Sequence, residues 1–168
     1  MVITDRYDHV VDDKNRLAIP SQVRNVMDPE KDGTAFYAVP EAHRYLQLIP
    51  EKLFERLAGM VPAGLQVPLE MAKARRLLFG AAPRLELDKQ GRVGLPDRFM
   101  RDGKKRVDPF DEAILGREVT LVGVGDRLEL WNRDDWRGHL RELYADQHSV
   151  QQAARELYAP LNGATQVL

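Results

Sequence analysis

One ten-residue motif occurs twice in the chain, and its later copy is Leu87-Asp88-Lys89-Gln90-Gly91-Arg92-Val93-Gly94-Leu95-Pro96. The earlier copy, seventy-six positions upstream, is Val11-Asp12-Asp13-Lys14-Asn15-Arg16-Leu17-Ala18-Ile19-Pro20. Each copy has an apolar residue, then Asp-x-x-(Gly or Asn)-Arg, then alternating apolar positions, then Pro. The similarity continues downstream, where residues 36–39 match 119–122 and residues 45–48 match 127–130. A repeat of this length indicates a duplicated small domain.

Each copy of the motif predicts a tight β-hairpin. The residues after the turn alternate as a strand does, both in 17–19 and in 93–95. Glycine suits a backbone position with positive φ, and asparagine is among the best other residues for it. Aspartate side chains accept hydrogen bonds from nearby loop amides. We therefore predict that four residues structure the hairpins: Asp12, Asn15, Asp88 and Gly91.

The charged residues of the two hairpins have two candidate roles. Arg16 and Arg92 each follow an aspartate by four positions, so each can fold back to form an ion pair. Arginine is also the side chain best suited to contact guanine edges or phosphates with two hydrogen bonds. Both roles hold if the carboxylate orients the guanidinium toward DNA. Lys14 and Lys89, near the hairpin tips, are either solvated lysines or phosphate contacts.

Composition bounds the class of protein. A chain of 168 residues that is 43% hydrophobic can bury a core, and the near-neutral balance of its charges argues against wholesale disorder. The chain contains no cysteine, which excludes disulfides and thiolate chemistry. No apolar run approaches the length of a membrane span, and the first residues lack an apolar signal region. We therefore expect a cytoplasmic protein with no membrane partner.

The sequence contains no recognisable catalytic or metal-binding pattern. Neither Ser21 nor Ser149 lies in a Gly-x-Ser-x-Gly elbow. Residues 123–125 lack the lysine of a phosphate-binding loop and predict a hairpin turn. No metal-ligand spacing relates the four histidines, His9, His43, His139 and His148. We predict no enzyme activity, no catalytic residue, no metal, no cofactor and no small-molecule substrate.

Hydrophobic periodicity predicts the remaining elements. An initial strand is expected within residues 1–11, and further strands near 35–39, 45–49, 118–122 and 127–131. Helices are expected at 21–27 with Ser21 as the cap, from Pro50 onward, and at 69–79, 134–146 and 150–157. Residues 103–115 look like an insertion, and 108–116 predict a loop with a helical turn. A tail with Pro160 and Gly163 is expected to be disordered.

Local charge is more informative than net charge. The 25 basic residues are balanced by 26 acidic ones, which gives no overall attraction to nucleic acid. Residues 83–106, however, contain eight basic and four acidic residues, whereas residues 1–27 contain four of each. A basic excess around one hairpin can form a nucleic-acid footprint, and several copies in an oligomer would multiply it.

These features together resemble the MraZ family of bacterial transcriptional regulators. The resemblance rests on the two Asp-x-x-x-Arg hairpins, on Arg75-Arg76-Leu77-Leu78-Phe79-Gly80, and on Leu128-Glu129-Leu130-Trp131. It extends from about Tyr7 to about Tyr144. The chain departs from the family pattern in Asn15, which replaces the usual glycine, and in the insertion at 103–115. The third strand of the first repeat also lies in a stretch bounded by prolines.

The resemblance implies an α+β fold, in which two tandem SpoVT/AbrB-like swapped-hairpin half-domains form a pseudo-two-fold, β-barrel-like core with flanking helices. The first repeat would span 5–60, a linker and connecting helix 61–82, the second repeat 83–144, and a C-terminal helix with a flexible tail 145–168. Lys14, Arg16, Lys89 and Arg92 would then bind double-stranded DNA.

The resemblance also implies a function. Such a protein is a sequence-specific DNA-binding regulator of the division and cell-wall gene cluster. It acts in the cytoplasm at the nucleoid, as a homo-oligomeric ring that recognises short direct repeats upstream of its own gene. A ring would explain how a neutral subunit binds DNA, because each protomer contributes one weak contact.

Two other functions remain compatible with the sequence. The fold could assemble a non-catalytic ring scaffold or protein-interaction module in which the arginines only stabilise the hairpins. The balanced charge of the first repeat and the presence of Asn15 favour this alternative. RNA binding is disfavoured because the larger aromatic residues lie in amphipathic patterns typical of a core: Phe54, Phe79, Phe99, Trp131 and Trp136. The salt dependence of binding would separate DNA from protein partners.

Overall fold

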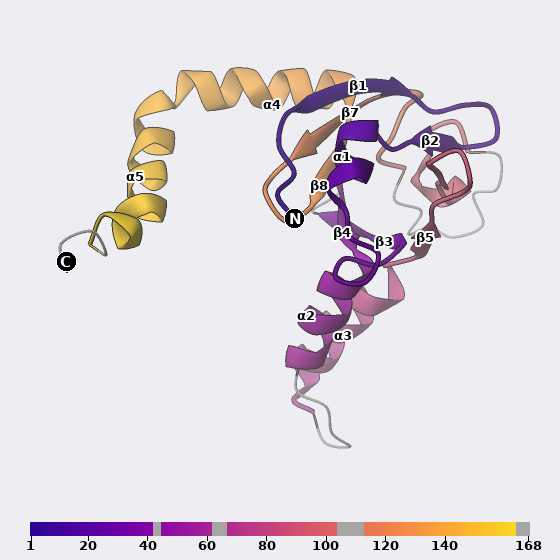
Figure 1. Cartoon of the computed structure of the whole chain (residues 1–168), viewed down its shortest axis with the longest axis horizontal. Helices are drawn as coiled ribbons and strands as arrows, with labels where there is room; N and C mark the ends of the chain where they lie inside the picture. The colour runs from indigo at the N-terminus through magenta and orange to yellow at the C-terminus, as the bar shows by residue number, and fades with distance from the viewer. Residues whose placement is uncertain (42–44, 62–66, 104–112, 164–168) are drawn as a thin grey trace. The chain divides into compact units, whose positions relative to one another are not determined.

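The computed structural model describes residues 1–41, 45–61, 67–103 and 113–163 of the chain (Figure 1). The chain divides into two compact units, Met1–Arg133 and Asp134–Leu168. The first unit contains a six-stranded sheet, a two-stranded sheet and helices α1–α3, whereas the second contains the helices α4 and α5. The predicted mixed α+β class is therefore confirmed. No helix among the described residues is long and apolar enough to cross a membrane.

All neighbouring strands of the six-stranded sheet are antiparallel. The order across the sheet is β1 (Arg6–Val10), β7 (Glu118–Gly123), β8 (Leu128–Asn132), β4 (Tyr45–Pro50), β3 (Ala35–Glu41) and β5 (Arg84–Glu86). The two-stranded sheet pairs β2 (Arg16–Ala18) with β6 (Arg92–Gly94). The strands predicted near 35–39, 45–49, 118–122 and 127–131 are confirmed.

Strand pairing in the first unit is unchanged when the two repeats are exchanged. In the small sheet, Leu17 lies opposite Val93, which is its own counterpart in the second repeat. In the large sheet, Gln47 of β4 lies opposite its counterpart Glu129 of β8. The outer pairs β1–β7 and β5–β3 are likewise equivalent. The pairing of the duplicated sequence therefore has pseudo-two-fold symmetry.

The strands on either side of each motif do not form a ladder with each other. β1 pairs with β7 and β2 pairs with β6, while β5 pairs with β3. Every one of these ladders joins a strand of one repeat to a strand of the other. The tight hairpin predicted from each motif is therefore wrong beyond the turn, because both flanking strands bond to the opposite repeat.

Alternating strand residues from both repeats form one core. Leu17 and Val93 are completely buried on the inner side of β2–β6. The main cluster continues through the large sheet, where its members include Phe36, Ala38, Leu46, Leu48, Val119, Leu121, Leu128 and Leu130. The predicted core positions of Phe99 and Trp131 are confirmed by exposed fractions of 0% and 2%.

The end of the predicted insertion belongs to this core. Ile114 and Leu115 are almost fully buried. The N–H of Leu115 donates to the carbonyl of Phe99 at 2.9 Å, and its carbonyl accepts from the N–H of Arg101 at 2.8 Å. Leu115 thus forms a parallel bridge with Met100, and residues 113–116 of the predicted loop contain no helical turn. Residues 104–112 lie outside the described residues.

Prolines precede each helical segment of the first unit. They stand before α1 (Ser21–Val26), α2 (Glu51–Met60), α3 (Leu69–Gly80) and the short 3-10 helix Asp97–Phe99, at Pro20, Pro50, Pro68 and Pro96. The fixed φ of proline suits the entry to a helix. The predicted cap at Ser21 is wrong because Pro20 occupies the cap position, and the Ser21 hydroxyl contacts Gln22 instead.

Aromatic packing fixes α2 on the large sheet. The ring of Phe54 stacks on Tyr37 of β3 with 4.2 Å between centroids, and Phe79 of α3 meets Phe54 edge-on at 6.0 Å. Both rings thus serve packing, as predicted.

The second unit consists of α4 (Arg133–Ala145) and α5 (Gln147–Gly163). The helix predicted at 134–146 is confirmed. The helix predicted at 150–157 is longer than expected at both ends and includes Pro160, so the predicted start of a disordered tail there is wrong. Proline removes one backbone donor at this position without ending the helix.

Candidate nucleic-acid interface

Two loops with the same backbone turn lie at the ends of β2 and β6. We call residues 12–16 loop 1 and residues 88–92 loop 2. The N–H of Asn15 donates to the carbonyl of Asp12 at 2.9 Å, and the N–H of Gly91 donates to the carbonyl of Asp88 at 2.9 Å. φ is 56° at Asn15 and 72° at Gly91. Glycine and asparagine adopt this left-handed conformation at the least cost.

One carboxylate oxygen of each aspartate fixes its loop through main-chain amides. In loop 1, Oδ1 of Asp12 accepts from the N–H groups of Lys14 and Arg16, both at 2.9 Å. In loop 2, Oδ1 of Asp88 accepts from the equivalent amides of residues 90 and 92, at 2.8 Å and 3.0 Å. These bonds hold the turn while leaving the second carboxylate oxygen available.

That second oxygen binds the arginine of the same loop. Arg16 donates to Oδ2 of Asp12 through Nε at 2.8 Å and approaches it through Nη2 at 2.7 Å. Arg92 contacts Oδ2 of Asp88 in the same way, at 2.9 Å and 2.7 Å. The hydrogen bond from Arg16 is the main cause that lowers the pKa of Asp12 to about 2. Arg92 likewise holds the pKa of Asp88 below its usual value.

The ion pairs orient the guanidinium groups without burying them. The side chain of Arg16 is 36% exposed and that of Arg92 is 26% exposed. Within the described part of the chain, Nη1 of neither arginine donates a hydrogen bond. The pairing with aspartate is thus present, and each arginine keeps one amine for another partner.

The two arginines lie on the same outer face of the small sheet. Arg16 is paired with Gly94, and Arg92 is paired with Ala18. Side chains alternate across a strand, so these four residues share the face opposite Leu17 and Val93. Diagonal neighbours of this kind have side-chain origins about 7–8 Å apart. Small residues beside each guanidinium leave this face flat and open.

The two lysines do not occupy equivalent positions. Lys14 aligns with Gln90, whereas Lys89 aligns with Asp13, and all of these side chains are exposed. Loop 1 consequently carries two carboxylates and two cations, whereas loop 2 carries one carboxylate and two cations. Sequence comparison of the loops predicts stronger attraction of phosphate to loop 2.

Loop 1 is bound to the second repeat by Arg117, a residue that sequence reasoning missed. Nη1 of Arg117 donates to the carbonyl of Asp12 at 2.7 Å and to Oδ1 of Asn15 at 2.8 Å. Nε of Arg117 donates to Asp102 at 2.7 Å. The amide nitrogen of Asn15 donates in turn to Asp97 at 3.1 Å. The asparagine thus links the two repeats, and its departure from the repeated glycine is the signal that points to this contact.

Loop 2 is covered by Arg24 of α1, which sequence reasoning also missed. Nε of Arg24 donates to the carbonyl of Ile19 at 3.1 Å. The guanidinium lies so close to Gly91 that a Cβ there would come within 2.6 Å of its central carbon. A glycine is therefore required beneath Arg24 for two reasons, the close approach and the positive φ.

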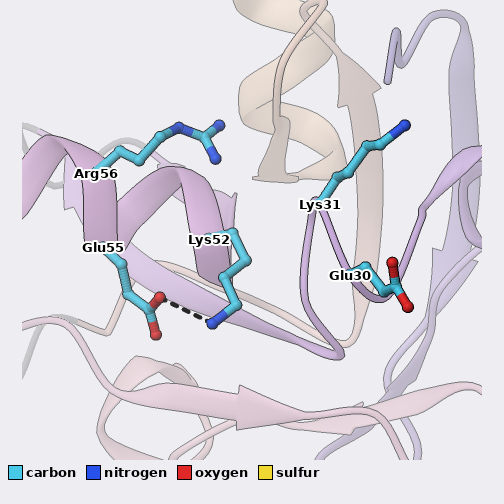
Figure 2. A pocket seen from close by; sticks show the side chains of 5 residues that line it. All are labelled: Glu30, Lys31, Lys52, Glu55 and Arg56. Atoms are coloured by element: carbon cyan, nitrogen blue, oxygen red, sulfur yellow. Dashed lines mark hydrogen bonds and ion pairs between the residues drawn. The ribbon is translucent and has the colours of Figure 1, made fainter.

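Away from the two loops, a pocket of about 440 Å³ lies between α2 and the turn before β3 (Figure 2). Lys52 and Glu55 of α2 form an ion pair at 3.1 Å, and Arg56 extends from the same helix. Glu30 and Lys31 line the pocket from the turn. The pocket contains charges of both signs and includes none of the residues that the sequence predicted to bind DNA.

Comparison with known proteins identifies the family. Residues 78–158 match the family model described as "MraZ protein, putative antitoxin-like". A protein of Moorella thermoacetica named transcriptional regulator MraZ is 34% identical over 147 residues, which cover 86% of this chain and 90% of that protein. A protein of the same name from Heliobacterium modesticaldum is 32% identical over 133 residues, 77% of this chain and 80% of the relative. The chain belongs to the MraZ family.

Proposed function

We propose that this protein is a sequence-specific DNA-binding transcriptional regulator. The observation that carries the proposal is the outer face of β2–β6, where Arg16 and Arg92 are held by aspartates and keep one amine each for a partner. A two-stranded ribbon fits the major groove of B-DNA, which is about 12 Å wide, and arginine there binds guanine. The names of the relatives agree with a regulatory role.

In this proposal the arginines and the lysines of the two loops have different roles. Arg16 and Arg92 contact base edges, while Lys14 and Lys89 contact phosphates from the loop tips. Asp12 and Asp88 orient the guanidinium groups, since a bound carboxylate removes rotational freedom before DNA arrives. The ion pairs and the DNA contacts therefore act together rather than as alternatives.

The wider context of the proposal follows the family resemblance. The two repeats are AbrB-like half-domains with interleaved strands, and the protein assembles as a homo-oligomeric ring at the nucleoid. The ring binds short direct repeats upstream of its own gene, in the division and cell-wall gene cluster. Repeated weak contacts would give a subunit of near-zero net charge enough affinity.

The main alternative is a ring scaffold or protein-interaction module with little specific DNA binding. The ion pairs Asp12–Arg16 and Asp88–Arg92 are the observation that favours it, because they give both arginines a structural partner. Catalysis does not enter either proposal, since the relatives are named as regulators rather than as enzymes.

Fluorescence anisotropy with two DNA duplexes tests the proposal. One duplex is the DNA immediately upstream of this protein's own gene, and the other is the same DNA with its short direct repeats scrambled. At fixed moderate salt, we expect the protein to bind the intact duplex at least tenfold more tightly. Equal binding to both duplexes, or binding to neither, would favour the scaffold. Arg56→Gln, an exposed position on α2, is a control that removes one charge away from the loops.

A further inference from the structure

Loop 2 has a surplus of positive charge that loop 1 lacks. Asp88 is the only carboxylate of loop 2, and it is neutralised by Arg92 at 2.7 Å. Lys89 is exposed beside it, and Arg24 adds a third cation from α1. None of the described carboxylates forms an ion pair with Lys89 or Arg24. Two uncompensated cations thus flank the same turn.

The position of Arg24 is fixed before any ligand binds. Its Nε donates to the carbonyl of Ile19, and its guanidinium rests on the backbone of Gly91. This bond uses Nε, and neither terminal amine of Arg24 donates a hydrogen bond within the described part of the chain. A guanidinium with two adjacent amines matches the geometry of two phosphate oxygens. An ordered arginine loses less conformational entropy on binding than a free one does.

Arg24 and Lys89 border a common pocket of about 260 Å³. Met27, Pro29 and Leu87 contribute an apolar wall, and Thr34 contributes a polar one. The pocket is large enough for a phosphate group with part of its sugar. Among its lining residues the cations Arg24 and Lys89 outnumber the one carboxylate, Asp88, which is already paired with Arg92, so the lining favours an anion.

An equivalent site cannot form beside loop 1. The position equivalent to Arg24 is Met100, which is 1% exposed in the core. The position equivalent to Lys89 is Asp13, which would repel a phosphate. The cation near loop 1 is Arg117, and it is paired with Asp102 at 2.7 Å. The pocket is therefore a specific feature of loop 2 rather than a product of the duplication.

We propose that Arg24 and Lys89 together bind one phosphate of the DNA backbone beside loop 2. This proposal rests on the proposed function, since it assumes that the loops approach DNA. It makes the two loops unequal partners in binding. Both loops contact base edges through their arginines, and loop 2 adds a phosphate site, formed by Arg24 and Lys89, that has no equivalent at loop 1.

The salt dependence of DNA binding tests this site. Binding constants of the full chain are measured from about 50 to 200 mM salt with the intact and scrambled duplexes, for wild type and for Arg24→Gln. The slope of log K against log salt is negative, and loss of one phosphate contact on B-DNA reduces its magnitude by about 0.9. We expect this loss with both duplexes, because a phosphate contact is independent of sequence. Arg24→Lys keeps the charge and should retain most of the slope.

Two further variants make the test specific. Arg56→Gln removes the same charge from α2 and should leave the slope unchanged. Lys89→Gln should lower the slope in the same direction, and its exposed loop position keeps the test available if Arg24→Gln fails to fold. The double variant should lose no more than about one phosphate, because both side chains hold the same group.

The outcomes separate the two proposals. A wild-type slope retained in Arg24→Gln would overturn the phosphate site, even if affinity fell, because it would show that Arg24 only packs on Gly91. A loss of two phosphates in the double variant would overturn the shared contact. If wild type bound both duplexes equally, the proposal of sequence-specific regulation would be wrong. The difference in salt slope between wild type and Arg24→Gln would still test the phosphate site. Absence of binding to any duplex would overturn both.

Discussion

Loops 1 and 2 have the same turn and the same ion pair but different supports. Loop 1 is tied to the second repeat by Arg117, which binds both Asp12 and Asn15. Loop 2 is covered by Arg24 of the first repeat, which lies on Gly91 without a hydrogen bond to the loop side chains. Each loop is thus supported by an arginine from the opposite repeat, through a polar network in one case and through packing in the other.

The difference shows what the duplication retained. The turn, the aspartate and the arginine are identical because they place a guanidinium on the shared outer face of β2–β6. The residues that surround them diverged, since either type of support suffices to hold the turn. The resulting asymmetry is electrostatic as well, because loop 1 is surrounded by Asp13, Asp97 and Asp102, whereas loop 2 faces a cationic pocket.

The largest effect is expected when the arginine that each loop contains is removed. In Arg16→Ala combined with Arg92→Ala, specific DNA binding should fall by roughly 100-fold or more, because each arginine–guanine contact supplies about 1–3 kcal/mol of discrimination. The protein should stay folded and keep its oligomeric state, since exposed ion pairs contribute only about 0–1 kcal/mol. Anisotropy, circular dichroism and size-exclusion chromatography measure these three properties.

The corresponding single variants sharpen the comparison. Arg16→Ala and Arg92→Ala should each lose specificity, and Arg16→Ala should retain more residual binding to scrambled DNA, because Arg92 still neutralises Asp88 beside Arg24 and Lys89. Unfolding of the double variant would instead assign the arginines a structural role. Arg56→Gln again provides the control for a change in net charge.

The next largest effect is expected when loop 1 alone loses its hydrogen bonds to Arg117. Arg117→Gln removes the donors for Asp12 and Asn15 and leaves Asp102 without its partner. Hydrogen bonds that involve a charged group contribute about 1.5–3 kcal/mol, and Arg117 is one-third exposed, so we expect a loss of about 2 kcal/mol. Urea denaturation measures this value.

A double-variant cycle with Asn15→Gly tests whether the contact is direct. Asn15→Gly loses the same hydrogen bond and should make Arg117→Gln cost less. Additive effects of the two substitutions would contradict a direct contact between these side chains.

A smaller effect concerns loop 2 alone. Gly91→Ala places a side chain at a φ of 72° and pushes Arg24 away from the turn. The left-handed conformation costs an L-residue about 1–2 kcal/mol, so thermal or urea unfolding should show a destabilisation of about that size. Gly91→Asn should cost less, because asparagine tolerates this conformation. Equal costs for Ala and Asn would indicate that displacement of Arg24, rather than φ, determines the loss.

Local features of this fold could be predicted from the sequence. The alternation of apolar residues predicted the strands near 35–39 and 118–122, and the residue types of Gly91 and Asn15 predicted their positive φ. The spacing of Asp12 and Arg16 allowed the ion pair that the structure contains. These features depend on residues within one turn or one strand, so the nearby sequence is enough to determine them.

Features that depend on distant residues could not be predicted in the same way. β2 bonds to β6 rather than to β1, because partner choice depends on how both repeats bury their apolar faces together. Arg117 is 102 residues from Asn15 and has no local pattern that identifies it. The helix that contains Arg24 was predicted, but the contact of Arg24 with Gly91 was not, since it exists only after the repeats have paired.

The smallest effect is the titration of the loop 1 carboxylate. Asp12 has a pKa of about 2 instead of 3.8, mainly because Arg16 hydrogen-bonds to its ionised form. A carboxylate whose pKa is lowered by folding stabilises the folded state at pH values above its ordinary pKa of 3.8. This contribution is lost as the pH falls through the folded-state pKa of about 2. In Arg16→Ala the pKa should rise toward 3.8, but only part of the way because the amides of Lys14 and Arg16 still donate to the carboxylate. Carbon NMR of the carboxyl group between about pH 5 and pH 1 measures the change.

Arg117→Gln is the matched control for that titration. Arg117 binds the main-chain carbonyl of Asp12 and not its carboxylate, so its removal should leave the pKa of Asp12 near 2 even though it destabilises the loop. The two arginines at loop 1 would then be separated by their effects: Arg16 holds the charge of Asp12, and Arg117 holds the turn. An unchanged pKa in Arg16→Ala would show that the amides alone hold the carboxylate. The guanidinium would in that case be free to rotate, and the orientation proposed for DNA recognition would lose its physical basis.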